Sequence, residues 1–322
     1  MKRMQISVVI ATYQRQALLR KCLKALQQQL LNKDCFEVIV VSDGPDEISA
    51  DVVVEFEDGN RFRYLSLAEK RGPAAARNFG WLNARAPLIA FTDDDTLPNE
   101  NWLNHLLGRA DVSKPQAFTG RVIVPRFERP TDYELNTAGL ETADFVTANC
   151  ACTKAALIAC GGFDERFSMA WREDSDLEFK LLQQNIPITK VDNAIVVHPV
   201  RAAKWGTSID EQKKTLFNAL LYKKFPKIYR ERIQPKPPYL YYGILIALVT
   251  FLTGWVIGMP RTEIFGGIIW LLLTTFLVVK RLKQTSLKPA HILEMVYTSM
   301  LIPHLSLYWQ WYGAIKYRTI LP

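Results

Sequence analysis

Apolar and polar positions follow two alternating patterns along the first third of this chain. Short apolar runs rich in Val, Ile and Phe predict strands, and the amphipathic stretches between them predict helices. The predicted strands are residues 6–12, 37–42, 62–67 and 88–91, and the predicted helices are residues 17–31, 48–57 and 74–84. Strands that alternate with helices form right-handed βαβ units. The fold class is therefore α/β, with a mostly parallel sheet and helices on both of its faces.

A less regular pattern follows residue 95. Its predicted elements are a helix at 102–107, a strand at 117–124, a mixed polar region at 126–144, a helix at 173–185, and two short strands at 188–191 and 194–197. We expect this second half to complete the same domain and to shape the side of the site that receives a second substrate.

Two long apolar runs stand near the carboxyl end. Residues 239–258 carry no charged side chain and are long enough to cross a hydrocarbon core of about 30 Å as a helix. Residues 264–279 form a second uncharged run that is slightly short for a full span. A buried core helix is the alternative for each run, but only residues 259–263 separate the two, which favours a transmembrane hairpin.

Charged residues indicate the orientation of this hairpin. Residues 204–236 and 280–288 are strongly basic, whereas the loop 259–263 is neutral. Basic flanks remain in the cytoplasm, so both ends of the hairpin are expected there. The net charge of +8 is then mostly explained by this orientation and by attraction to anionic membrane lipid. That attraction contributes about 1 kcal/mol of binding free energy per juxtamembrane Lys or Arg. Nucleic acid is not expected as a partner, because the excess lies beside the apolar runs and no nucleic-acid motif accompanies it.

These patterns predict a multi-pass protein of the cytoplasmic (inner) membrane. Its parts are an α/β domain in the cytoplasm (1–203), a basic amphipathic juxtamembrane segment (204–238), a transmembrane hairpin (239–280) and a C-terminal part (281–322). That last part would hold a basic loop and an interfacial or re-entrant helix at 291–317, since a third crossing would place the basic carboxyl end outside. The start of the chain predicts no signal peptide. Five Cys residues without a CxxC pair indicate reduced thiols.

Three carboxylates, Asp93, Asp94 and Asp95, directly follow the predicted strand 88–91. They fall at the carboxyl end of a buried parallel strand, where open α/β sheets bind ligands. In a turn, Asp93 and Asp95 converge on one divalent cation, which in turn holds two phosphates of a nucleotide. A bare Asp-x-Asp arises by chance about once in a chain of this length. Its weight comes from the strand before it and the motifs around it, which together indicate an enzyme acting on a phosphorylated substrate.

Five segments in order carry a resemblance to a known family. They are residues 8–13 (VVIATY), 40–44 (VVSDG), 71–80 (RGPAAARNFG), 91–95 (FTDDD), and 161–165 with 171–177 (GGFDE, WREDSDL). The ordered set resembles the inverting glycosyltransferases of family 2, which have a GT-A-type, Rossmann-like nucleotide-sugar-binding fold. The resemblance covers about residues 5–200. It implies that residues 1–203 are the catalytic domain of a membrane-anchored, bacterial-like member.

The resemblance implies a set of donor-binding residues. They are Thr12, Tyr13, Asp43, Arg71, Arg77, Asn78, Asp93 and Asn149. The helix start between Arg71 and Arg77 also offers free backbone N–H groups to an anion. A simple turn is the alternative for Asp43, and a solvated helical Arg is the alternative for Arg71.

The resemblance also implies a metal cofactor, Mn²⁺ or Mg²⁺. Asp95 is expected to bind this ion, which neutralises the nucleoside diphosphate as it leaves, while Asp94 is expected to point away. His198 ends a β-branched run and is expected as a further metal or diphosphate ligand. A structural His is the alternative.

An inverting displacement needs a carboxylate that takes the proton of the acceptor hydroxyl. The resemblance assigns this role to Asp174, with Glu173 orienting the acceptor. The alternative for Glu173, Asp174 and Asp176 alike is a carboxylate in the first turn of a helix that interacts with the helix dipole.

The expected function is transfer of a single sugar from a nucleotide sugar, foremost a UDP-sugar, to a lipid-linked or other glycan acceptor at the cytoplasmic membrane face, in cell-surface glycan synthesis. Processive synthases of the family carry Gln-x-x-Arg-Trp, whereas residues 201–205 read Arg-Ala-Ala-Lys-Trp. A non-catalytic nucleotide-sugar-binding scaffold subunit is the main alternative, which the intact Asp95 and Asp174 disfavour. A nucleotidyltransferase or dinucleotide-dependent enzyme needs a Gly-rich loop after the first strand, and residues 12–16 contain no glycine.

Overall fold

The computed structural model describes residues 4–56 and 59–320 and divides the chain into two compact units. The N-terminal unit comprises Met1–Pro125 and Ala138–Val200, and the C-terminal unit comprises Arg126–Thr137 and Arg201–Pro322. Residues 126–137 therefore belong to the C-terminal unit. The sequence had placed them inside the predicted α/β domain, residues 1–203.

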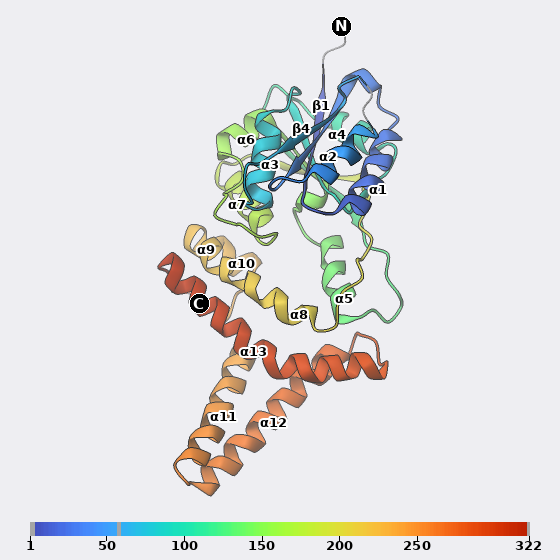
Figure 1. The fold of residues 1–322 in the computed structure, drawn as a ribbon. Helices are drawn as coiled ribbons and strands as arrows, with labels where there is room; N and C mark the ends of the chain where they lie inside the picture. Colours follow the sequence, from blue (N-terminus) through green and yellow to red (C-terminus); the bar gives the residue numbers. More distant parts are fainter. Residues whose placement is uncertain (1–3, 57–58, 321–322) are drawn as a thin grey trace. The chain divides into compact units, whose positions relative to one another are not determined.

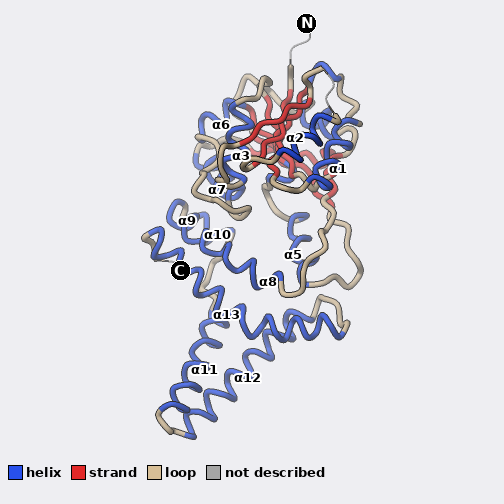
Figure 2. The backbone as a smooth tube through the Cα atoms, in the orientation of Figure 1, coloured by secondary structure: helices blue, strands red, loops and turns tan. Residues whose placement is uncertain are grey.

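The N-terminal unit is built on an eight-stranded sheet with the strand order β3-β2-β1-β4-β7-β6-β8-β5. Its strands are drawn as arrows in Figure 1 and in red in Figure 2. Its strands are β1 (Ile6–Thr12), β2 (Phe36–Ser42), β3 (Phe62–Ser66), β4 (Leu88–Asp93), β5 (Leu97–Pro98), β6 (Ala117–Ile123), β7 (Cys150–Thr153) and β8 (Ile188–Val197). Strands β1 to β4 pair only in parallel with one another, as the βαβ pattern predicts. Strand β7 pairs antiparallel with both β4 and β6, so the second half of the sheet is mixed.

Helices cover both faces of this sheet (Figure 1). They are α1 (Gln16–Gln27), α2 (Glu47–Val54) and α4 (Trp102–Leu107) on one face, and α3 (Pro73–Leu82), α6 (Lys154–Cys160) and α7 (Glu173–Gln183) on the other. Side chains of a strand alternate between the two faces: Val8 packs in the first core cluster and Val9 in the second. Burial on both faces explains why the central strands read as continuous apolar runs.

The structure departs from the predicted elements at several places. Strands β5 and β7 were not predicted, because two and four residues respectively are too short to carry a clear periodic pattern. The two strands predicted at 188–191 and 194–197 are one strand, β8, whose pairing with β6 jumps from Val191 to Ile195 at an irregularity. The predicted helix 48–57 is α2, which already ends at Val54; the predicted last residue, Glu57, lies outside the described residues.

The C-terminal unit is helical. Its helices are α5 (Asp132–Ala138, whose last residue belongs to the N-terminal unit), α8 (Thr207–Asp210), α9 (Leu216–Lys224), α10 (Pro226–Arg232), α11 (Tyr239–Val256), α12 (Pro260–Leu282) and α13 (Pro289–Tyr317). Short 3₁₀ helices lie at Lys33–Cys35, Gly139–Glu141 and Thr147–Asn149 in the N-terminal unit and at Glu211–Thr215 in the C-terminal unit. The segment predicted as an interfacial or re-entrant helix is part of α13, which runs through Pro303.

Helices α11 and α12 form the predicted apolar hairpin, and both are long and apolar enough to cross a membrane. A Cβ at Gly254 would meet the backbone of Glu263, and a Cβ at Gly266 would meet the backbone of Phe251. These two glycines let the helix backbones touch, as small residues do where helices pack in a membrane.

Candidate functional site

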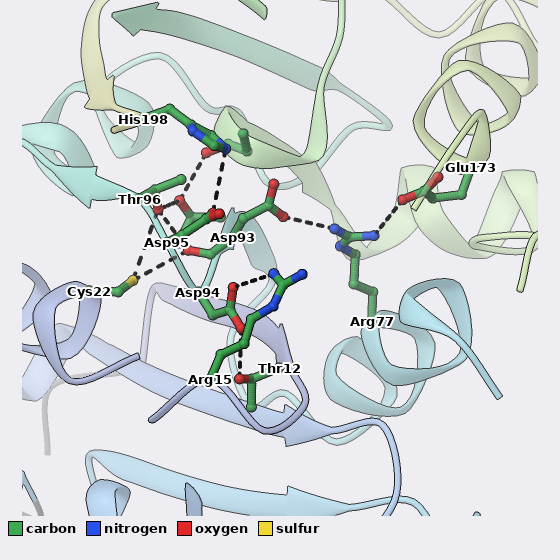
Figure 3. A network of polar contacts seen from close by, with 12 residues as sticks. Thr12, Arg15, Cys22, Arg77, Asp93, Asp94, Asp95, Thr96, Glu173 and His198 are labelled. Carbon is green, nitrogen blue, oxygen red and sulfur yellow. Dashed lines mark hydrogen bonds and ion pairs between the residues drawn. The ribbon is translucent and has the colours of Figure 1, made fainter. Parts of the chain in front are cut away.

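The three carboxylates lie at the carboxyl edge of the sheet, on a turn that the strands and two threonines hold in place (Figure 3). Parallel pairing aligns Ala11 of β1 with Asp93 of β4, so the two strands end together. The hydroxyl of Thr96 donates to the carbonyl of Asp93 at 2.8 Å and lies 2.7 Å from the hydroxyl of Thr92. These bonds tighten the turn and direct successive carboxylates to different sides.

Asp94 points away from its two neighbours, which confirms the expectation. Its Oδ2 accepts a hydrogen bond from the hydroxyl of Thr12 at 2.8 Å, and its Oδ1 pairs with the guanidinium of Arg15 at 3.1 Å. Burial raises the pKa of Asp94, and Arg15 opposes this rise. Thr12, expected to bind the donor, therefore uses its hydroxyl to hold the carboxylate turn.

Asp93 and Asp95 meet His198 in a cluster of possible metal ligands, all within 4.8 Å of one another. The Nε2 atom of His198 lies 3.4 Å from Oδ1 of Asp95. Its Nδ1 atom is buried without a hydrogen-bond partner among the described residues. Two carboxylate oxygens and one imidazole nitrogen form a donor set that fits Mn²⁺, and also Mg²⁺ completed by water and phosphate oxygens.

Strand β5 is what brings His198 to this cluster. Leu97 pairs with Val197 in an antiparallel bridge, so the chain just after Asp95 lies beside the end of β8. The amide of His198 also donates to the carbonyl of Ile123, which fixes the residue at the sheet edge.

Arg77 connects the carboxylate turn to the start of helix α7. Its guanidinium donates to Asp93 at 2.8 Å and to Glu173 at 3.0 Å, and the side chain is almost completely buried. Burial alone would lower the pKa of Arg77, but the two carboxylates more than offset it and raise this pKa above its ordinary value. The residue expected as a donor contact is thus a buried cation shared by two acidic groups.

Glu173 and Asp174 stand at the first turn of α7 in different surroundings. Glu173 is 3% exposed and faces Arg77, and its burial raises its pKa to about 7. Asp174 is partly exposed, accepts the backbone N–H of Ser175 at 2.7 Å, and has a pKa raised by desolvation. Asp174 is therefore the more accessible carboxylate of the pair. Asp176 instead forms a buried ion pair with Lys180 at 2.9 Å.

Asp43 lies at the carboxyl end of β2 and organises the loop that leads to α3. Its Oδ1 accepts the backbone N–H groups of Arg71 and Gly72, both at 2.7 Å. Gly72 has φ +99°, and a Cβ there would clash with the backbone of Ser168, so only glycine fits. The Oδ2 atom of Asp43 has no hydrogen bond from any described residue. Nearby, the ammonium of Lys70 lies 4.3 Å from the ring centre of Tyr13.

Two expected donor contacts, Asn78 and Asn149, both have side-chain amides that take part in hydrogen-bond networks within the chain. Asn78 donates to the carbonyl of Phe163 and to Glu165, and accepts from Phe163 and Trp81. It thereby fastens the loop 161–165 to α3.

Asn149 is 0% exposed and binds Trp102 together with the carbonyls of Arg121 and Ala194, at the irregularity in β8. A direct sugar contact would require Asn149 to give up part of this network, and its role in donor binding stays a prediction. The remaining expected donor residue, Arg71, is half exposed and pairs with Glu165.

The prediction from the sequence missed Arg15, Thr92 and Thr96. The only local signal for the two threonines is that their hydroxyls bracket the Asp triplet at a spacing of four residues. Arg15 lies just after the first strand. Nothing in the sequence shows that it pairs with Asp94.

Comparison with known proteins assigns this architecture to a family. The model of the family described as Glycosyl transferase family 2 matches residues 7–167. Validoxylamine A glucosyltransferase of Streptomyces hygroscopicus subsp. limoneus is 30% identical over 224 residues, which cover 57% of this chain and 49% of that protein. Hyaluronan synthase of Pasteurella multocida is 25% identical over 269 residues, covering 70% of this chain and 28% of the synthase. The chain spans about half the length of the curated relatives it matches first.

Solved structures share the fold at lower sequence identity. The mannosyltransferase PcManGT of Pyrobaculum calidifontis, in complex with GDP-Man and Mn²⁺, has a TM-score of 0.52 at 19% identity and covers 98% of this chain and 88% of its own. TarS residues 1–349 of S. aureus, in complex with UDP-GlcNAc, has a TM-score of 0.52 at 14% identity and covers 99% of this chain and 93% of its own.

Proposed function

Because this chain belongs to glycosyl transferase family 2, we propose that it is a metal-dependent, inverting glycosyltransferase that transfers a single sugar. The donor is a nucleotide sugar, foremost a UDP-sugar, and the acceptor is a lipid-linked glycan precursor at the cytoplasmic face of the membrane. The product would serve cell-surface glycan synthesis. TarS binds UDP-GlcNAc and PcManGT binds GDP-Man, so tests of the donor must include both uridine and guanosine nucleotides.

The observation that supports this proposal most is the continuous series of charged groups at the carboxyl edge of the sheet. Asp93, Asp95 and His198 form the ligand cluster, Arg77 joins Asp93 to Glu173, and Asp174 follows Glu173 directly. When bound, a divalent cation supplies positive charge that offsets the charge of the nucleoside diphosphate leaving group. One buried cation thus joins the ligand cluster to Glu173, the chain neighbour of the carboxylate that would accept a proton.

Side chains of the protein carry out proton transfer, the positioning of α7 and nucleoside binding. Asp174, the more accessible carboxylate of α7, takes the proton of the acceptor hydroxyl, and its raised pKa makes it a stronger base than an ordinary Asp. Arg77 and Glu173 hold the start of α7 against the carboxylate turn. Asp43 keeps the Arg71–Gly72 backbone in place and leaves one carboxylate oxygen for a nucleoside N–H or hydroxyl.

Membrane attachment is supported by helices α11 and α12 and by their basic flanks. We propose that these helices form a hairpin whose two ends face the cytoplasm, as the positive-inside rule requires. The hairpin makes a lipid-linked acceptor the natural substrate, because such a lipid shares the membrane with it.

The test is thermal stabilisation of the detergent-solubilised chain by UDP, GDP, TDP and CMP, each with and without Mn²⁺. Ligand binding to the folded state raises the unfolding temperature by mass action, even when the acceptor is unknown. We expect one nucleotide to stabilise the protein only with Mn²⁺, and Asp95→Ala to abolish the effect. The matched variant Asp192→Ala, an exposed carboxylate on β8, should keep it. The absence of any nucleotide effect would contradict the glycosyltransferase proposal, and it would equally contradict a scaffold subunit that binds nucleotide sugars.

A further inference from the structure

The C-terminal unit contains a pocket of about 300 Å³ that is separate from the carboxylate cluster of the N-terminal unit. Its lining comes from residues 131–134, residues 201–208, and His291 with Glu294 in the first turns of α13. All of these residues belong to the C-terminal unit.

Most acidic groups of this pocket already serve the protein's own structure. Asp132 accepts from Arg281 at 2.8 Å, and Glu134 accepts the backbone N–H of Thr131 at 2.6 Å. Glu294 accepts the backbone N–H of Gly206 at 2.7 Å. The acceptor capacity of the pocket is therefore largely used by groups that shape it.

The groups of this pocket without protein partners are donors. His291 is 6% exposed, and neither ring nitrogen makes a hydrogen bond with a described residue, although Nδ1 lies 3.5 Å from a carboxylate oxygen of Glu294. The ammonium of Lys204, an exposed residue of the lining, has no ion-pair partner among the described residues. A buried polar group without a partner is costly unless a ligand satisfies it. A ligand rich in acceptor oxygens would satisfy both donors.

The pocket adjoins the end of an apolar helix. Arg281, in the last turn of α12, donates to Asp132 and also to the hydroxyls of Thr298 and Ser299 in α13, at 2.8 and 2.9 Å. Arg281 thus connects the lining segment 131–134 to the carboxyl end of α12. In the proposed orientation, the basic residues that follow α12 keep this end at the cytoplasmic face. The positive end of the α13 dipole also lies at this pocket and favours an anion.

We propose that this pocket binds a phosphate ester, with the headgroup of a membrane lipid as its source. Lys204 and His291 donate to the phosphate oxygens, and the adjoining end of α12 lets the acyl chains remain in the bilayer. The site is distinct from the nucleotide site and does not depend on sugar transfer. A soluble phosphate would meet the same donors, so the experiment separates the two sources.

The test is calorimetric titration of the detergent-solubilised full chain with dihexanoyl phosphatidate, with dihexanoyl glycerol as the lipid that lacks phosphate. We expect phosphatidate to bind and the glycerol lipid not to bind. Lys204→Gln and His291→Gln should each weaken phosphatidate binding about tenfold, since the first removes the charge of a donor and the second replaces the rigid ring N–H with an amide of different reach. Lys227→Gln removes the same charge from an exposed position on α10 outside the pocket and should leave binding unchanged.

Competition by inorganic phosphate distinguishes a lipid headgroup from a soluble phosphate as the ligand. If it displaces phosphatidate, phosphate alone is sufficient for the site; if it does not, the site requires the lipid. Equal weakening by Lys204→Gln and Lys227→Gln, or no weakening by Lys204→Gln, would overturn the proposal. Lys204 is exposed, so its variant tests the site even if His291→Gln fails to fold. Mn²⁺-dependent nucleotide stabilisation should persist in every variant, which keeps this test independent of the proposed function.

Discussion

The amino and carboxyl ends of the sheet differ in how far the charge of their buried carboxylates is compensated by neighbouring groups. At the amino end, Glu37 is 0% exposed and accepts from the hydroxyl of Ser7, the backbone N–H of Arg85 and the guanidinium of Arg63, at 2.7 to 2.8 Å. At the carboxyl end, three consecutive carboxylates face two arginines, of which Arg77 is shared with Glu173. The first end is neutralised by the chain itself. The second keeps an excess of negative charge, and only that end is prepared for a cation.

The largest expected effect separates proton transfer from cation binding at the carboxyl end. Asp174→Asn should lower the rate of sugar transfer by about 10³-fold, because general-base catalysis contributes on the order of 10²–10⁴. Donor binding, measured by Mn²⁺-dependent nucleotide stabilisation, should remain close to that of the unaltered protein. Equal loss of both properties would make Asp174 a structural residue.

The next prediction exchanges one carboxylate for its amide at each end of the sheet. Glu37→Gln should lower the free energy of unfolding by about 3 kcal/mol, because it leaves buried donors facing an amide. Asp95→Asn should change it by less than about 1 kcal/mol without metal, because it also relieves repulsion among like charges. Urea denaturation of both variants in detergent measures the difference. Equal destabilisation would mean that the carboxyl end is as well compensated as the amino end.

The pH dependence of stability gives a smaller effect. Burial raises the pKa of Glu173 to about 7, whereas an unfolded Glu titrates near about 4.3. The folded state therefore keeps a proton that the unfolded chain loses, so this stabilisation is complete below about pH 4.3 and lost as pH rises through about 7. Its contribution falls by at most about 1.4 kcal/mol per pH unit. Glu173→Gln should make the pH dependence of the free energy of unfolding shallower between about pH 5 and 8, while Asp94 and Asp174, whose pKa values are also raised, keep part of it. Urea unfolding measures this dependence, and an unchanged slope would assign it to those other groups.

The smallest effect is expected at Arg71. Its ion pair with Glu165 is exposed on both sides, so Arg71→Gln should change the free energy of unfolding by less than about 1 kcal/mol. If Arg71 contacts the donor, the KM for the nucleotide sugar rises while kcat changes little. An unchanged KM would leave Arg71 as a solvated helix-entry residue.

Most of the first half of the fold was predictable because its signals are local. Strands β1 to β4 are buried on both faces and separated by amphipathic helices, so their apolar runs and their parallel pairing follow from the pattern. The second half was less predictable because β5 and β7 are short, and the irregularity that joins the two parts of β8 depends on the buried amide of Asn149. The resemblance placed Asn149 at the sugar, but contacts from β6, β8 and Trp102 occupy it.

The sequence by itself determined that carboxylates stand at strand ends, that two apolar helices follow the α/β unit, and that α7 begins with Glu173 and Asp174. These properties depend on neighbouring residues and on the period of each element. Only the tertiary structure decided which side chains meet: β5 beside β8 brings His198 to Asp95, Arg77 bridges Asp93 and Glu173, and Asp94 turns to Arg15. Each of these meetings joins residues far apart in the chain. Burial and charge in the folded state select among many possible partners, and no local pattern encodes that choice.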